Sequence, residues 1–405
     1  MPSNHAAWQP SLTIHLASAK IKLTTVGLTQ RLGELGNYFD NRSNSKRPVL
    51  RVMKIEKSQK NTRDIIKDME IPITQSKEWQ KLQNDLGKTS FFESASDFQY
   101  LAILNKTPVG NYLYLPYGPV AKDEKSFQAA LTSLNTIAKK TRAIFIRVEP
   151  QSTSFIKYLP KNSRKSKDLN PKETWVLDLT GNDEGLKQKL PSRLLRYYKS
   201  ANSKSITIET SCDPEDIKYL LNLQKALAKE KGISTFSEDY LKAELSQPFA
   251  TLYLVKYHNN DNTSSQPNCD NSQHIQSDKH DREDCKASSC RDDVVAAGLV
   301  FDDKYTRYNL QGAQSEQGRK LHATGILTIQ LILDAKVKSL HTFDFWGIAP
   351  EGAPSSHPWA GFTNFKKTFA GREVDYAGTY DIILSSTKYH LYQLTRKINR
   401  FLRRI

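Results

Sequence analysis

The sequence is poor in cysteine and lacks long apolar runs. Only four of its 405 residues are cysteine, and three of them lie in one polar stretch, which excludes a disulfide framework of the kind found in small secreted proteins. No run reaches the roughly 18 apolar residues that a membrane-spanning helix needs. The N-terminus lacks the basic-then-apolar order of a secretory signal. These absences predict a cytoplasmic protein.

Residues 258–293 are rich in Asn, Asp, Ser and Gln and contain almost no large apolar side chain, so we expect a disordered loop inserted between two strands. The segment also contains residue types that bind zinc, namely Cys269, His274, His280, Cys285 and Cys290. No C-x-x-C pair is present, however, and the spacing matches no common zinc framework. We therefore expect no metal.

The chain carries 59 Lys and Arg against 43 Asp and Glu, a formal net charge of +16. This excess predicts an anionic partner: RNA, acidic lipid headgroups or a diphosphate-bearing substrate. Charge alone does not choose among them, and a basic protein without such a partner remains an alternative.

The pattern of apolar residues divides the chain into modules. Residues 1–70 show no sustained period and form an extension. Helices and short strands alternate over 71–160 and again over 172–385, including helices over 124–140 and 319–338 and a strand pair over about 373–384. Residues 161–171 form a basic linker flanked by proline. This order predicts an α/β fold with mixed (α+β) sheets.

Residues 386–405 are predicted to form a basic amphipathic C-terminal helix. The sequence has no acidic residue after Asp381, and apolar residues recur at helical spacing at Leu391, Leu394, Ile398, Phe401 and Ile405. Such a helix suits the anionic inner face of a membrane, or the phosphates of a tRNA. A helix that packs on the fold and exposes a charged face is the alternative.

The segment 342–378 has the composition of a site. An alternating strand that ends at Trp346 is followed by a dozen residues in which Gly347, Pro350, Gly352 and Pro354 prevent regular structure. Aromatic side chains can order such a loop, and rigid loops at strand ends often bind ligands. Beyond the loop lies the Phe365-Lys366 pair.

Several motifs in the sequence resemble those of the Fem family of peptidoglycan interpeptide-bridge aminoacyltransferases. The matching residues are 343–348 (FDFWGI), 357–362 (HPWAGF), 365–369 (FKKTF) with Gly371, and 376–381 (YAGTYD). Residues 308–321 (YNLQGAQSEQGRKL) resemble the family's YLYGASSxExRxL. Residues 114–120 (YLPYGPV) resemble its YxPRGPV, with Tyr117 in place of the arginine. Together the motifs span roughly residues 72–400.

The resemblance implies tandem GNAT-like acyltransferase domains, an aminoacyl-tRNA donor with no cofactor, and a UDP- or lipid-linked muropeptide as acceptor. It assigns catalysis to Lys366, through the charge that develops on the tRNA end, and to Phe365, which can stack on the terminal adenine. The family's RYxIR run corresponds to RLLRYYK here, so Arg196 and Lys199 are expected to bind the diphosphate; a solvated basic helix face is the alternative. Tyr117, Trp346, Trp359 and Tyr380 complete the expected substrate-binding residues.

Alternatives remain for the donor and for the site. An acyltransferase that uses a CoA or carrier thioester is disfavoured because residues 314–323 offer only Gly318 where a pyrophosphate loop needs a second small residue. A non-catalytic module that binds tRNA or membranes is the other possibility. Phe365 and Phe369 also fit the apolar stripe of a short helix, with Lys366 on its solvated face. No motif encodes the amino acid transferred.

Overall fold

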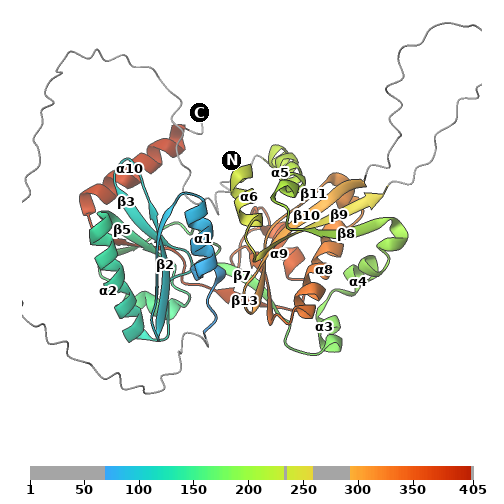
Figure 1. Cartoon of the computed structure of the whole chain (residues 1–405), viewed down its shortest axis with the longest axis horizontal. Coiled ribbons are helices and arrows are strands. Elements are labelled where there is room, and N and C mark those ends of the chain that lie inside the picture. Colours follow the sequence, from blue (N-terminus) through green and yellow to red (C-terminus); the bar gives the residue numbers. More distant parts are fainter. Residues whose placement is uncertain (1–68, 232–234, 259–291, 403–405) are drawn as a thin grey trace, which may run out of the picture. The chain divides into compact units, whose positions relative to one another are not determined.

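The computed structural model describes residues 69–231, 235–258 and 292–402. These residues form two seven-stranded mixed sheets with helices packed on them, so the expected α/β fold with mixed sheets is confirmed (Figure 1). All but Met69 and Glu70 of the expected extension 1–70 lie outside the described residues.

The first sheet has the strand order β1-β2-β3-β5-β14-β6, with β4 paired to β2. Only β3 and β5 are parallel, and helix α2 (Glu124–Thr141) connects them. The strands are β1 (Thr89–Ser94), β2 (Phe98–Asn105), β3 (Asn111–Leu115), β4 (Val120–Ala121), β5 (Ala143–Val148), β6 (Ser163–Lys165) and β14 (Tyr380–Ile383).

The second sheet has the order β13-β7-β12-β11-β10-β9-β8. Again a single pair, β11 and β12, is parallel, and the helices α7 (Glu316–Lys320) and α8 (Ala323–Val337) connect its strands. The strands are β7 (Glu173–Asp178), β8 (Ile206–Ser211), β9 (Ala250–His258), β10 (Asp292–Asp302), β11 (Thr306–Gln314), β12 (Thr342–Gly347) and β13 (Arg372–Asp375).

The two sheets share one topology. In each, an antiparallel meander of three strands (β1-β2-β3 or β9-β10-β11) is followed by a helix and then by a strand parallel to the third. Two further antiparallel strands, β14 and β6 or β7 and β13, lie beyond it. The sequence halves are not visibly repetitive, so the repeat appears only at the level of strand pairing.

Local capping residues mark where helices begin. Ser76 caps α1 by accepting from the Trp79 backbone N–H, and Asp123 and Ser126 form a capping box at the start of α2. The other helices are α1 (Lys77–Asp85), α3 (Asp183–Lys189), α4 (Ser192–Lys199), α5 (Ile217–Lys231), α6 (Glu238–Leu245), α9 (Ala360–Lys366) and α10 (Ser386–Leu402). Short 3₁₀ turns are η2 (Ile73–Gln75), η3 (Thr153–Tyr158), η4 (Asn202–Lys204) and η5 (Pro214–Asp216).

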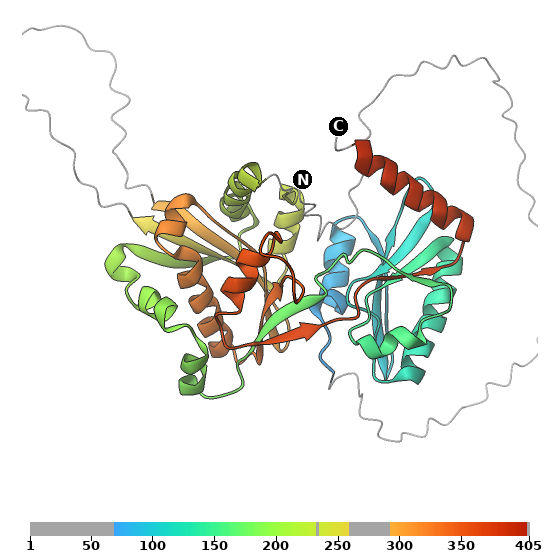
Figure 2. The same cartoon turned by 180° about the vertical axis from the view of Figure 1, so that it is seen from behind.

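Each sheet has a core on both faces. Helix α2 packs on one face of the first sheet and α10 on the other (Figure 2). Tyr389 and Tyr392 of α10 contact Phe145. Helices α3, α4 and α8 cover one face of the second sheet. Its other face shares a core with α1, α5 and α6. In the described part of the chain, no helix combines the length and apolar character needed to cross a membrane.

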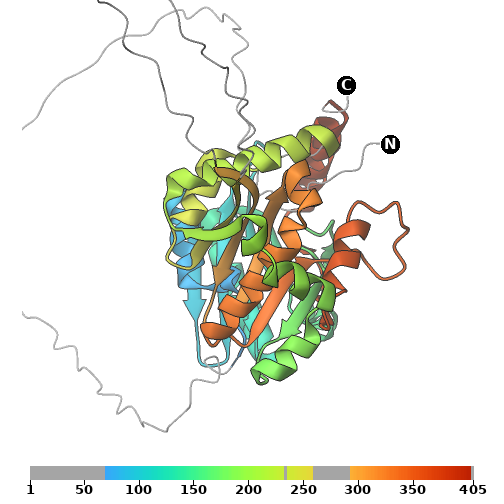
Figure 3. The same ribbon diagram turned by 90° about the vertical axis from the view of Figure 1, so that its right-hand side faces the viewer.

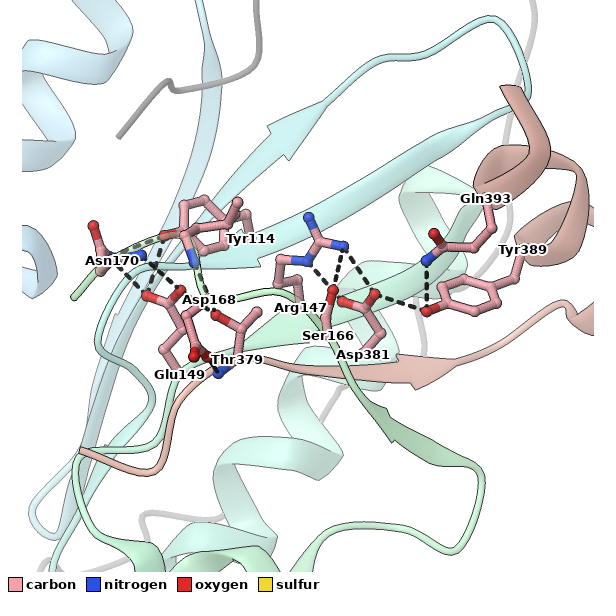
Figure 4. A network of polar contacts seen from close by, with 11 residues as sticks. Tyr114, Arg147, Glu149, Ser166, Asp168, Asn170, Thr379, Asp381, Tyr389 and Gln393 are labelled. Atoms are coloured by element: carbon pink, nitrogen blue, oxygen red, sulfur yellow. Dashed lines mark hydrogen bonds and ion pairs between the residues drawn. The ribbon is translucent and has the colours of Figure 1, made fainter. Parts of the chain in front are cut away.

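The sheets do not follow the division expected at residues 160 and 172. Strand β6 lies inside the expected linker 161–171, and β14 lies inside the expected second module, yet both pair in the first sheet. The physical reason is a buried ion pair: Arg147 of β5 donates to both carboxylate oxygens of Asp381 at 2.7 and 2.8 Å (Figure 4). The two strands expected over 373–384 form as β13 and β14, but they do not pair with each other, because they join different sheets.

The expected helix over 319–338 is also interrupted. It forms as α7 and α8, with His322 between them in the left-handed conformation (φ 58°). The imidazole of His322 stacks on Tyr197 of α4, with ring centroids 4.1 Å apart. This contact accompanies the break that periodicity alone did not predict.

The inserted segment begins and ends within a β-ladder. His258 and Asp292 are paired residues of β9 and β10, so the boundaries expected at 258 and 293 belong to the strands. Residues 259–291, with the candidate zinc ligands, lie outside the described residues.

Replacing residues 259–291 by a short Gly/Ser turn is expected to preserve folding and activity. If the segment is the flexible loop that the sequence predicts, closing a shorter loop should raise the free energy of unfolding by up to about 2 kcal/mol. Urea denaturation of both proteins would measure this. A less stable variant that has also lost stoichiometric zinc would show that the segment is a metal site.

Candidate active site

Strand β12 presents alternate side chains to two environments. Phe343 and Phe345 enter the core beneath α8, whereas Thr342 and Asp344 point to the opposite face and line a cavity of about 1310 Å³. Neighbouring strands add to the same wall, including Val176 of β7. The alternation that predicted a strand thus delivers one buried carboxylate to the cavity.

A bulge ends the strand. The pairing of β12 with β7 shifts between Asp344 and Gly347, and Trp346 adopts φ 66°, a left-handed conformation that costs a non-glycine residue about 1 kcal/mol or more. One Asp344 carboxylate oxygen accepts from the Trp346 backbone N–H at 2.7 Å and stabilises the turn. Bulges of this kind redirect side chains next to active sites.

Past the bulge the chain runs close to its neighbours. A Cβ on Gly347 would lie 2.6 Å from Pro171 Cγ and 3.2 Å from the Trp359 ring, so only glycine fits there. The residues between β12 and α9 form turns, as their Gly and Pro content predicted; Figure 3 shows them as an orange-red loop. Thr363 anchors α9 to this loop by accepting from the Ala349 N–H at 2.8 Å.

Lys366, the last residue of α9, reaches back to the bulge. Its ammonium donates to the Gly347 carbonyl at 2.6 Å. It lines a second cavity, of about 180 Å³, whose wall is mostly apolar and aromatic. The other lining residues are Pro171, Phe236, Leu310, Gln311, Trp346, Gly347, Trp359 and Phe362.

The two ionisable groups beside the bulge perturb each other; Asp344 is buried and Lys366 is partly buried. Burial lowers the pKa of Lys366 to about 8, and the negative charge of Asp344 partly opposes this shift. Burial raises the pKa of Asp344 to about 7, with the Trp346 N–H and Lys366 opposing it. Such paired displacements are common where proteins carry out acid–base chemistry.

Aromatic side chains pack against Trp346 of the bulge. The ring of Tyr117 lies 5.5 Å from that of Trp346 and 4.6 Å from that of Tyr376, between centroids. Tyr117 is itself fixed, because its hydroxyl donates to the Pro171 carbonyl at 2.8 Å and its N–H donates to the buried Glu149 carboxylate at 3.2 Å. Burial raises the pKa of Glu149. This packing holds Trp346 in place.

The structure brings together three of the expected site residues, Lys366, Trp346 and Trp359. Tyr117 lies one layer behind them. Phe365 packs on Phe369 and the core beneath α8 rather than lining either cavity; Phe362, three residues earlier, lines the smaller one and is half-exposed.

The remaining three expected residues lie elsewhere. Arg196 and Lys199 are exposed on α4, which packs on α8 on the far face of the second sheet. Tyr380 is in β14 and packs on the core beneath α2. None of them lines either of the two cavities described above.

Sequence reasoning missed two polar residues at the site. Asp344 stood out only as a charge between two phenylalanines of an apolar strand. Gln311 lies in the smaller cavity where the family motif has tyrosine; its side chain accepts from Gln224 at 2.9 Å and faces the buried carboxylate of Glu244. Burial raises the pKa of Glu244 to about 8.

The chain is similar to several known proteins. The sequence model of the FemAB family matches residues 218–397. The crystal structure of FemX superposes with a TM-score of 0.62 at 18% identity, covering 80% of this chain and 94% of that chain. L-PGS from Bacillus licheniformis matches with a TM-score of 0.47 at 15% identity, over 82% and 99% of the two chains. A tandem GNAT protein from the clavulanic acid pathway matches with a TM-score of 0.42 at 9% identity, over 70% and 78%. No curated protein sequence matches.

Two sheets of one topology, each with a helix between its parallel strands, make up a fold that the crystal structure of FemX shares. Residues 218–397 match the model of the FemAB family, and they include β12, α9 and the bulge between them. The resemblance that the motifs predicted is therefore confirmed.

Proposed function

We propose that this protein is an aminoacyltransferase that moves an amino acid from aminoacyl-tRNA to the stem-peptide amine of a peptidoglycan precursor. The observation that carries the proposal is Lys366, a partly buried ammonium in an aromatic cavity inside the segment that matches the FemAB family. Acyl transfer from an ester requires alignment of two substrates and stabilisation of an oxyanion. A fixed cation in a site of low dielectric supplies the second requirement.

The two cavities fit a reaction with two substrates. Lys366 lines one and Asp344 the other, and both residues are held by the same bulge of β12. In this proposal the donor ester enters the smaller cavity, where Trp359 and the half-exposed Phe362 offer surfaces on which a base can stack. The acceptor occupies the larger cavity.

The proposed donor needs no cofactor, since the ester of aminoacyl-tRNA is already activated. A net charge of +16 favours binding of its phosphates. Arg196 and Lys199 are exposed in the last turn of α4 and are available to a phosphate or diphosphate, although they lie away from both cavities. We propose that Arg196 and Lys199 contact tRNA or the acceptor outside the two cavities.

Incubation of the protein with a pool of charged tRNAs and a muropeptide tests the proposal. A mass increase of the muropeptide by one or more amino-acid residues supports it and identifies the residue added. Transfer only from a CoA or carrier thioester would replace the donor, and tRNA or membrane binding without turnover would replace the enzyme by a binding module. UDP-linked and lipid-linked muropeptides are assayed separately.

Helix α10 suits a second part of the proposal, contact with an anionic membrane that carries a lipid-linked acceptor. Its Tyr389 and Tyr392 face the first sheet, while Leu391, Leu394 and Ile398 are 50%, 52% and 49% exposed. These three lie on one face of the helix, with the exposed Lys388 and Lys397 beside them. Half-exposed aliphatic side chains flanked by cations are typical of helices that lie in a bilayer interface.

Substituting serine for Leu391, Leu394 and Ile398 together is expected to weaken binding to phosphatidylglycerol vesicles on the order of a hundredfold, since each exposed half side chain contributes about 1 kcal/mol when buried. Sedimentation with vesicles measures this. Truncation after Leu384 is a poorer test, because it also removes Tyr389 and Tyr392 from the core.

The control for this experiment is Lys388→Gln with Lys397→Gln, which should reduce the salt dependence of binding and leave the apolar contribution. Transfer to a lipid-linked acceptor should fall with vesicle binding, and transfer to a UDP-linked acceptor should not. Unchanged vesicle binding by the serine variant would rule out the membrane role.

A further inference from the structure

Several carboxylates line the larger cavity. Its walls come from the second-sheet strands β7, β11, β12 and β13 and, opposite them, from residues between Met69 and Gln99. Most polar groups in it are already engaged. Asp302 binds Arg307 and Lys338, and Asp303 accepts from the Tyr308 hydroxyl and from two backbone N–H groups.

Asp344 differs from these carboxylates. It is 3% exposed, and within the described residues its one hydrogen bond is from the Trp346 N–H to Oδ1. Lys366 interacts with it electrostatically, but the Lys366 ammonium donates to the Gly347 carbonyl instead of forming a direct ion pair. The second oxygen of Asp344 is thus available to a ligand in the cavity.

We propose that this cavity binds the primary amine of the acceptor and that Asp344 takes a proton from it. The inference rests on the proposed function and names the residue that prepares the nucleophile. A primary amine at neutral pH is an ammonium ion, which cannot attack a carbonyl until it loses a proton. A buried carboxylate both attracts the ammonium and accepts that proton.

The proton and bond balance closes without any further reagent. The acceptor ammonium gives one proton to the Asp344 carboxylate, and the lone pair thus freed forms a bond to the ester carbonyl carbon. Lys366 stabilises the oxyanion. Collapse breaks the bond from that carbon to the ribose oxygen, which leaves with the second amine proton as a tRNA hydroxyl. Asp344 returns its proton to water through the cavity.

The surroundings of Asp344 determine its titration. Lys366 favours its charged form, and Asp303 opposes it. The hydroxyls of Tyr117, Tyr308 and Tyr376 each interact electrostatically with Asp344. Arg372 and Glu70 line the same cavity. The pKa of Asp344, about 7, places its ionisation where a base must work at neutral pH.

Asp344→Asn is therefore expected to lower kcat/KM by about a hundredfold. In the wild-type protein kcat/KM should rise with pH through about 7, as Asp344 ionises, and fall above about 8, as Lys366 loses its proton. The variant should lack the rise. Its thermal midpoint at pH 8 should not fall, because a carboxylate whose pKa is raised by folding destabilises the folded protein once it is ionised. A purely structural role predicts the opposite, a less stable protein.

Asp303→Asn is the matched control. It removes a buried carboxylate that lines the same cavity but holds a turn, so the rise of kcat/KM should persist and move to lower pH, because Asp303 raises the pKa of Asp344. Asp344→Asn with wild-type kcat/KM and an unchanged pH profile would overturn the proposal.

A second measurement separates this proposal from the proposed function. Carboxyl ¹³C NMR of the full chain, labelled at aspartate, should show one signal that titrates near pH 7 in the wild type and is missing from Asp344→Asn. The signal does not require turnover. If it titrates near pH 4 instead, Asp344 is not the base; if wild-type transfer fails while the signal titrates near 7, it is the proposed donor or acceptor that is wrong.

Discussion

Lys366→Ala is expected to reduce aminoacyl transfer by on the order of a hundredfold or more while leaving the fold intact. Loss of one preorganised oxyanion stabiliser typically has this effect. The Lys366 ammonium is held by the Gly347 carbonyl in a cavity lined by Trp346 and Trp359. Among the described residues that line this cavity, Lys366 is the one cation, so no other can replace it. Single-turnover assays with charged tRNA and the muropeptide that the transfer assay identifies as acceptor would measure the change.

The adjacent lysine provides a control of equal charge. Lys367 is exposed, pairs with Glu373 at 3.3 Å and lies over the Trp175 ring, outside both cavities. Lys367→Ala should transfer at close to the wild-type rate. Equal losses in the two variants would mean that α9 binds tRNA through general positive charge, and near-normal turnover by Lys366→Ala would remove it from the mechanism.

The second large effect concerns stability. Asp381→Asn is expected to lower the free energy of unfolding by about 3–5 kcal/mol, because it leaves the buried Arg147 guanidinium without its counter-ion. Arg147 is 1% exposed, and the Tyr389 hydroxyl of α10 also donates to Asp381, at 2.9 Å (Figure 4). Denaturant unfolding monitored by circular dichroism would measure the loss.

Two further variants test the cause. The double variant Arg147→Met with Asp381→Leu should recover part of the stability, since it removes both charges together. Glu316→Gln removes the exposed partner of Lys320 on α7 and should change the free energy by less than about 0.5 kcal/mol. If Asp381→Asn cost no more than Glu316→Gln, the buried pair would contribute little to holding β14 in the first sheet.

Local chemistry was sufficient to predict several elements. The helix expected at 124–140 formed as α2, with Asp123 as its cap, because capping and apolar periodicity are both properties of a few neighbouring residues. The Gly/Pro-rich loop after β12 was predicted for the same reason. The Fem motifs then placed Lys366, Trp346 and Trp359 in one site, and the structure brings these three together.

The features that sequence reasoning missed depend on distant contacts. The role of Asp344 depends on the bulge that turns β12 and on the cavity built by four strands, neither of which has a periodic signal. Phe365 and Phe362 differ only in which side of α9 meets the core, which required knowing where the core lies. The transfer of β14 to the first sheet joins residues 234 positions apart.

The position of β14 also constrains the order in which this protein can be made. The first sheet contains the strand between β5 and β6 only when residues 380–383 are present, and these follow all the strands of the second sheet in the sequence. N-terminal domains usually fold while synthesis continues. Here the ribosome must synthesise every strand of the second sheet before the first sheet can close, although most strands of the first sheet are made earlier.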